Sequence, residues 1–350
     1  MTDRLSYLEL KKNLVLEGKT IKTKGLDLPI ETSALIGHIE HGENGEIPWS
    51  DFVRGMLLHL ALHGHDTDYE KFLADTVRNP AMLALHYADE ESDDLFLEAA
   101  RILTDEPMVA VAHAQNLLRK AAKGDDAALK EAMEELDRIL DQAPFAPAYA
   151  LYGELFLTLG DELKAHQYFK HALTSGEHPE FQETMRERVE ETATGATVTL
   201  AIDAMNKGRT EEAYKILTDR LKDDDAGILH YWQGVALQGL GRLPESVDAF
   251  RCAQDKRPED LRISNDLAIS LYMLGDREEA VAVLKKVMSS GDPRILCNLM
   301  ILSEPDDQRF ADEIYQKLQQ LESENAIEDA SISEAVKEYG ARFAERGASN

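Results

Sequence analysis

Cysteine is scarce in this sequence. Among its 350 residues only Cys252 and Cys297 are cysteines, and neither belongs to a CxxC pair or to a cysteine and histidine cluster. A framework of disulfides needs more cysteines than this, and so does a zinc ribbon. The sequence therefore excludes small disulfide-stapled folds and cysteine-based zinc modules.

Long apolar runs and an excess of positive charge are also missing. No window of about 18 apolar residues occurs anywhere, and the N-terminal segment lacks the continuous apolar core of a signal peptide. The 38 basic residues are outnumbered by 66 acidic ones, which gives a formal net charge of −28. Such a charge repels phosphate backbones and anionic lipid head groups. We therefore expect an acidic, cytoplasmic protein whose partners are neither nucleic acids nor membranes.

Aromatic residues are few, at 7% of the chain, whereas 43% of the residues are hydrophobic and 30% are charged. This composition is typical of a soluble protein that is rich in helices and has enough apolar residues for a core.

Four glycines mark an internal repeat. Gly160, Gly208, Gly241 and Gly275 each follow an apolar helical stretch and precede a second amphipathic stretch. The last three are almost evenly spaced, and their spacing matches a known repeat period of about 34 residues. Repeats of this length contain a helix, a turn and a second helix.

Small and large side chains recur at fixed distances from these glycines. A small residue stands seven residues before the turn and another five residues after it, and a large apolar residue follows nine residues after it. Small side chains let the two helices approach closely, and the large one fills the remaining space. The three sets are Gly153, Ala201, Gly234 and Ala268; Ala165, Ala213, Ser246 and Ala280; and Phe169, Leu217, Phe250 and Leu284.

The segment GVALQGLGRLPESVDAFRCAQDKRPED, which begins at Gly234, resembles a unit of the tetratricopeptide-repeat (TPR) family, including Phe250, Ala253 and Pro258. Segments that begin at Leu151, Thr199 and Ile263 are similar to the same unit. This resemblance implies an all-α protein, a right-handed α-solenoid of helix-turn-helix repeats. It also implies binding of other proteins or peptides.

We expect three regions along the chain. Residues 1–105 form a less regular, mostly helical N-terminal region, which is either a set of diverged repeats or a separate helical domain. Residues 106–294 form the TPR solenoid, and residues 295–350 form C-terminal capping helices. Within the solenoid the predicted units are a degenerate one at 108–144 and clear ones at 146–178, 194–226, 227–260 and 261–294, with an extra helix at about 178–193.

Histidines supply the best candidate for chemistry. His59 and His63 are one helical turn apart, and His65 follows. A metalloprotease helix would need glutamate where this chain has Leu60, so a general base is missing. We therefore favour solvated histidines over a metal site, and we predict no cofactor and no enzymatic activity.

In TPR proteins the first helices of the hairpins line a concave groove, and the resemblance implies that eleven side chains of this chain point into it. The predicted groove is apolar and aromatic, unlike the lysine- and asparagine-rich clamp with which some TPR domains hold acidic chaperone tails. We expect it to bind an extended apolar segment or an amphipathic helix. The eleven residues are Val198, Ile202, Met205, Tyr231, Val235, Gln238, Arg262, Asn265, Ile269, Tyr272 and Met273.

Several functions stay open at this point. We favour a non-catalytic scaffold or adaptor, chaperone-like or an assembly factor, over a peptide-sensing regulatory protein and over a metal-dependent N-terminal domain carried on a TPR tail. Two alternatives concern the groove itself. Its side chains either pack against neighbouring helices or are covered by a C-terminal helix at 332–346, and an exposed groove would favour self-association.

Overall fold

A computed structural model describes residues 4–9, 14–16, 19–21, 25–40, 47–91 and 93–348. The chain divides into two compact units. The first comprises Met1–Asp161 and Gln167–Arg188, and the second comprises Glu162–His166 and Val189–Asn350.

Two small antiparallel strand pairs open the first unit. β1 (Leu5–Leu8) pairs with β4 (Leu28–Glu31), and β2 (Leu14–Leu16) pairs with β3 (Lys19–Ile21). Strands β2 and β3 and most of β4 fall within residues 13–30, where short apolar and β-branched runs are separated by Gly18 and Gly25.

Strand β4 packs closely on a helix of the first unit. Leu28 and Ile30 are fully buried in the same apolar cluster as Phe52 and Met56 of that helix. A Cβ added at Gly55 of this helix would lie only 2.0 Å from the carbonyl oxygen of Pro29 in β4, so glycine is required for the close approach of helix and strand.

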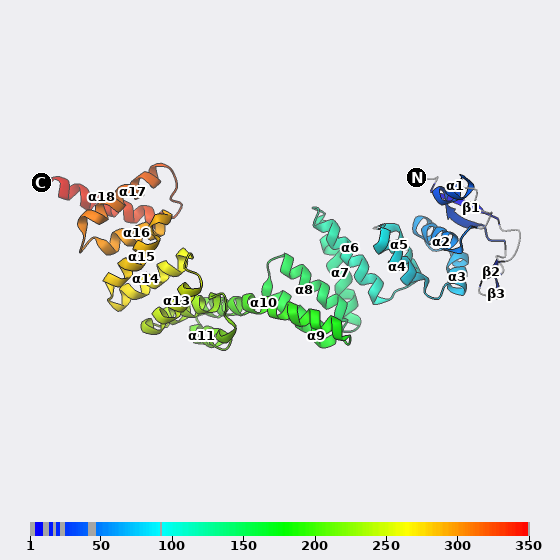
Figure 1. Ribbon diagram of the computed structural model, residues 1–350, viewed down its shortest axis with the longest axis horizontal. Helices are drawn as coiled ribbons and strands as arrows, with labels where there is room; N and C mark the ends of the chain where they lie inside the picture. The colour runs from blue at the N-terminus through cyan, green and yellow to red at the C-terminus, as the bar shows by residue number, and fades with distance from the viewer. Residues whose placement is uncertain are drawn as a thin grey trace. The chain divides into compact units, whose positions relative to one another are not determined.

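The rest of the described chain is helical, and Figure 1 shows the helices following one another in chain order. The first unit contains α1 (Thr32–Glu40), α2 (Trp49–His63), α3 (Thr67–Thr76), α4 (Pro80–Glu91), α5 (Asp94–Leu103), α6 (Pro107–Ala121), α7 (Asp126–Gln142) and α8 (Ala146–Thr158). Two helices, α9 (Glu162–Ser175) and α10 (Pro179–Asn206), contain residues of both units. The second unit contains α11 (Thr210–Thr218), α12 (Ile228–Gly239), α13 (Leu243–Lys256), α14 (Leu261–Leu274), α15 (Arg277–Val287), α16 (Pro293–Ser303), α17 (Gln308–Ser323) and α18 (Ala330–Ala348).

The predicted turns are confirmed. Gly160, Gly208, Gly241 and Gly275 have φ angles of 77°, 73°, 71° and 97°. Side chains other than glycine are strained in this left-handed region. Each glycine follows one helix and precedes the next, so the four positions form the same kind of turn between the two helices of a hairpin.

The predicted packing between small and large residues is also confirmed. A Cβ on Gly234 would meet the ring of Phe250 at 2.7 Å, and one on Gly153 would meet the ring of Phe169 at 2.4 Å. Both phenylalanines are fully buried. In these two hairpins the second helix therefore lies against the first at the distance that the missing Cβ permits.

Helix α10 is continuous. It covers the extra helix expected at about 178–193 and also the first helix of the repeat expected at 194–226. It has 28 residues. After Pro179 at its start this stretch contains no proline, and Gly195 is its single glycine. Nothing in the local sequence therefore ends the helix between the two expected parts.

The helices that follow the last clear repeat form a further hairpin, α16 and α17, with α18 packed against both. Ile332, Val336 and Tyr339 of α18 are buried in the same cluster as Leu296 and Met300 of α16. The C-terminal helix thus packs against the last hairpin and shares its core. No helix in the described part of the chain is both long and apolar enough to cross a bilayer.

Candidate functional site

The first helices of three consecutive hairpins, α12, α14 and α16, present one continuous surface in the second unit. Tyr231 Oη donates to Asp266 Oδ2 at 2.9 Å, and Asn298 Nδ2 donates to Asn265 Oδ1 at 2.7 Å. Residues three or four apart share one side of a helix, so each helix contributes a row of side chains. We call this surface the open face and define it by Tyr231, Val235, Gln238, Arg262, Asn265, Asp266, Ile269, Tyr272, Met273, Arg294, Asn298 and Ile301.

Eight of the eleven residues predicted to line a groove belong to the open face. The other three lie on α10 and are half-buried. Val198 and Met205 pack against a cluster that includes Ala201 and Leu229, as Tyr231 and Val235 of the open face pack against the cluster of Phe250. Ile202 is the third of this set.

One end of the open face is polar and carries two arginine–aspartate pairs. Arg262 Nη2 lies 2.9 Å from Asp260 Oδ2, and Arg294 Nη2 lies 2.8 Å from Asp292 Oδ2. The hydrogen bonds from the arginines hold the pKa values of both carboxyl groups below their usual range. A pocket of about 170 Å³ lies here, lined by Tyr231, Leu261, Arg262, Asn265, Asp266, Asp292, Arg294 and Ile295.

Tyr231 is a fixed part of this polar end. Its side chain is half-buried, and burial together with the carboxylate of Asp266 raises the pKa of its hydroxyl. The phenol therefore stays protonated and donates to Asp266 over the whole physiological range.

The other end of the open face is apolar and exposed. Tyr272, Met273 and Ile301 have exposed fractions of 45%, 56% and 43%. Arg294 and Ile301 are seven residues apart on α16, which at 1.5 Å per residue separates the two ends by about 10 Å. An elongated ligand would therefore meet polar groups at one end and apolar side chains at the other.

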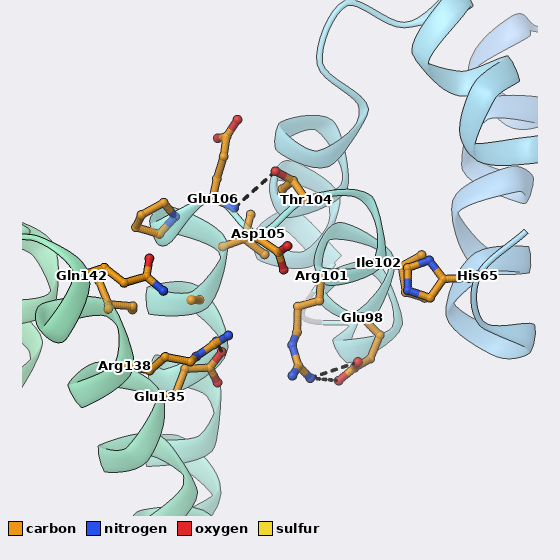
Figure 2. Close-up of a pocket in the computed structure, with 14 residues that line it drawn as sticks. His65, Glu98, Arg101, Ile102, Thr104, Asp105, Glu106, Glu135, Arg138 and Gln142 are labelled. Atoms are coloured by element: carbon orange, nitrogen blue, oxygen red, sulfur yellow. Dashed lines mark hydrogen bonds and ion pairs between the residues drawn. The ribbon is translucent and has the colours of Figure 1, made fainter. Parts of the chain in front are cut away.

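A larger pocket lies in the first unit, at the C-terminal ends of α5 and α7 and the first turn of α6. Its volume is about 500 Å³. Figure 2 shows Arg101 and Glu98 on the α5 side of this pocket and Arg138 and Glu135 on the α7 side. The lining residues are His65, Glu98, Arg101, Ile102, Thr104, Asp105, Glu106, Pro107, Val109, Ala110, Glu135, Arg138, Ile139 and Gln142.

A buried histidine connects the two sides. His113 of α6 and Glu135 are only 6% and 8% exposed, and Nδ1 of His113 is hydrogen-bonded to Oε2 of Glu135. Burial acts to raise the pKa of Glu135, but the hydrogen bond from His113 and the nearby positive charges outweigh it, and the pKa is lowered. Arg138 Nη2 donates to Oε1 of the same carboxylate at 2.9 Å.

Many solved structures align with parts of this chain, among them the three that follow. A crystal structure of MamA shares 18% identity over 50% of this chain and 96% of its own, with a TM-score of 0.38. YrrB, described as a TPR protein with an unusual peptide-binding site, shares 17% identity over 53% of this chain and 86% of its own, with a TM-score of 0.35. PilF of Pseudomonas aeruginosa shares 17% identity over 67% of this chain and 99% of its own, with a TM-score of 0.42. No protein-family model matches the sequence, and no curated protein matches it.

The chain's own geometry decides the type of repeat, because left-handed glycine turns recur at an even spacing and a buried aromatic ring meets a glycine across the hairpin. The hairpins are TPR-like. In the hairpins α12–α13, α14–α15 and α16–α17, the first helix supplies the residues of the open face and the second helix packs against the first.

The open face differs from the predicted groove in its residues and in its chemistry, since it includes α16 in place of α10 and is apolar at only one end. Sequence analysis missed Asp266, Arg294, Asn298 and Ile301. The spacing contained a signal for one of them, because Asn298 stands one repeat length after Asn265. The turn after α16 has no glycine, so the repeat pattern does not extend into this helix.

Two of the three candidate histidines of the first unit are paired with other groups, and the ring of His63 lies 4.7 Å from that of His59. His59 Nδ1 is 2.9 Å from the hydroxyl of Tyr7, and its Nε2 is 3.4 Å from Asp66. His65 Nδ1 lies 3.0 Å from Glu70. In the part of the chain that the structure describes, no three histidine, cysteine or acidic side chains are placed to hold a metal ion together.

Proposed function

We propose that this chain is a non-catalytic scaffold or adaptor that holds a segment of a partner protein on the open face. One observation carries this proposal. Three consecutive helical hairpins, the first two of them TPR-like, present a continuous row of first helices with exposed apolar side chains at one end and amide and guanidinium groups at the other. A monomer has no structural need for Tyr272, Met273 and Ile301 to be exposed together on that surface.

The polar end favours an extended segment over an amphipathic helix. A helix satisfies its own backbone N–H and C=O groups, whereas an extended segment leaves them free for a binding surface. Side chains that both donate and accept suit such a backbone, and Asn265 and Asn298 are of this kind. We therefore propose that the partner segment is extended, with apolar side chains over Tyr272 and Ile301.

A matched set of variants tests this proposal. Tyr272→Ala with Ile301→Ala removes the apolar end, while Leu274→Ala removes an equally exposed apolar side chain of α14 that lies outside the open face. Cross-linking of wild type in source-cell lysate, followed by mass spectrometry, identifies the partner segment, and a synthetic peptide of that segment is then titrated against all three proteins.

We expect Leu274→Ala to bind the peptide as wild type does. Burial of one large apolar side chain contributes about 1.5–3 kcal/mol, so loss of two should weaken binding by roughly 100-fold or more. Equal affinity of all three proteins would overturn the proposal. Cross-links that join open faces of two copies of this chain would instead indicate self-association.

A further inference from the structure

The buried His113 of the first unit has a different neighbour on each ring nitrogen. Nδ1 faces Glu135 of α7, and Nε2 lies 3.3 Å from Nη1 of Arg101 of α5. The same Nη1 is 3.4 Å and 3.3 Å from the two carboxylate oxygens of Glu98. One guanidinium nitrogen therefore contacts both the histidine and a glutamate of its own helix.

This geometry fixes the protonation state of the ring. A guanidinium group donates hydrogen bonds and cannot accept them, so Nε2 of His113 has to be the acceptor. The ring is then neutral, with its hydrogen on Nδ1 and directed to Glu135. Only this tautomer satisfies both contacts.

A second proton on the ring would break the arrangement. Nε2–H would then face the N–H of Arg101, and two positive groups would meet at 3.3 Å. An alternative acceptor is close, because Oε1 of Glu98 lies only 4.0 Å from Nε2. A small shift of the Glu98 side chain would therefore pair it with the imidazolium.

The surroundings of the ring contain few other charges. Glu98 and Arg101 face it from α5, and Glu135, which is paired with Arg138, faces it from α7. Helices α4 and α8 also pack against α6, but none of their described charged groups contacts the ring. The imidazolium would thus lie between two carboxylates, and Arg101 would be the group that has to leave.

We propose that His113 is a proton-operated switch, in which protonation moves the Nε2 contact from Arg101 to Glu98 and releases the Arg101 guanidinium into the pocket between α5 and α7. The pocket has room for this movement, since Arg101 already lines it and its volume is about 500 Å³ (Figure 2). In the released form the lining of the pocket is less negative and contains a free guanidinium. The switch lies in the first unit and is independent of the open face.

Nuclear magnetic resonance of the full chain tests the switch. The ring carbon of His113 and the side-chain Nε of Arg101 are followed while the pH is lowered from about 8 to about 5, the range that brackets ordinary histidine titration. We expect both signals to move with one common midpoint. In Glu98→Gln the imidazolium loses its carboxylate, so the common midpoint should fall to lower pH.

Two further variants complete the test. His113→Gln keeps a donor for Glu135 and an acceptor for Arg101 but does not titrate, so the Arg101 signal should become flat over the same range. His86→Gln removes an exposed histidine of α4 and should leave the Arg101 titration unchanged. The proposal is overturned if Arg101 stays still while His113 titrates, if His113 does not titrate in this range, or if Arg101 moves equally in His113→Gln. Circular dichroism at pH 8 checks that each variant is folded, and Glu98→Gln remains informative should His113→Gln unfold.

Discussion

Replacement of Gly234 by alanine tests the packing rule of the repeat. A Cβ at this position would lie 2.7 Å from two ring carbons of Phe250, which is fully buried and has no room to withdraw. Gly239, at the end of the same helix, provides the control. A Cβ there would meet only the methyl group of Thr210 at 3.4 Å, an ordinary contact.

Both substitutions have the same favourable contribution to the free energy of unfolding, and only Gly234→Ala has an unfavourable one. Alanine in place of a helical glycine gains up to about 1 kcal/mol from helix propensity and the unfolded state. Overpacking of a filled core costs about 1–3 kcal/mol. Gly239→Ala should therefore raise the free energy of unfolding, while Gly234→Ala should lower it or leave it near the wild-type value. The difference between the two variants mainly reports the clash and should be about 1–3 kcal/mol.

Local fluorescence is the suitable measurement, since Trp49 and Trp232 are the only tryptophans and Trp232 is in α12. In a Trp49→Phe background, urea unfolding followed at Trp232 reports the stability of this hairpin. Adding Phe250→Leu to Gly234→Ala should recover part of the loss, because the smaller side chain vacates the space of the ring. A Gly234→Ala protein as stable as the Gly239→Ala protein would refute the packing argument.

Three further outcomes follow from the structure. Tyr231→Phe removes the hydrogen bond to Asp266 and should lower the free energy of unfolding by about 1–2 kcal/mol in the same urea assay. Because the pKa of Glu135 is lowered, its ionised form stabilises the fold above the ordinary carboxyl pKa, and this contribution is lost as the pH falls through the lower folded-state value. Glu135→Gln should therefore show a smaller drop in melting temperature between neutral and acidic pH than wild type. Arg342→Ala breaks a partly exposed pair with Glu304, which keeps Arg346 as a partner, and should cost less than about 1 kcal/mol, seen as little change in the urea midpoint.

The repeat could be predicted from sequence because its determinants are local. A glycine with a positive φ stands at each turn, and the small and large residues that meet across a hairpin are close in the chain, as Gly234 and Phe250 are. The residues that determine the geometry of a repeat therefore all lie within one repeat length. The buried faces of the N-terminal helices could be read in the same way, since Phe52 and Met56 follow helical periodicity.

The chemistry of the open face could not be predicted to the same extent, because polar contacts join different repeats. Asn265 and Asn298 meet across 33 residues, and either side chain alone is typical of a solvated helix surface. His113 and Glu135 are a similar case, 22 residues apart on two helices of one hairpin. In a chain with 66 acidic residues, periodicity does not indicate which carboxylate a given histidine meets.

Tyr231 and Tyr272 are both predicted from the sequence to line the groove, but in the structure they differ in burial and in contacts. The ring of Tyr231 lies 5.8 Å from that of Phe250, and its hydroxyl is bound to Asp266, so its removal would disturb the hairpin itself. Tyr272 is 45% exposed and has Arg277 against its ring. Loss of binding in a Tyr231→Ala protein would therefore mix instability with a lost contact. Loss of binding in a Tyr272→Ala protein that unfolds at the wild-type urea concentration would be evidence for contact with the partner alone, and this is why the apolar end of the open face is the place to test the proposed function.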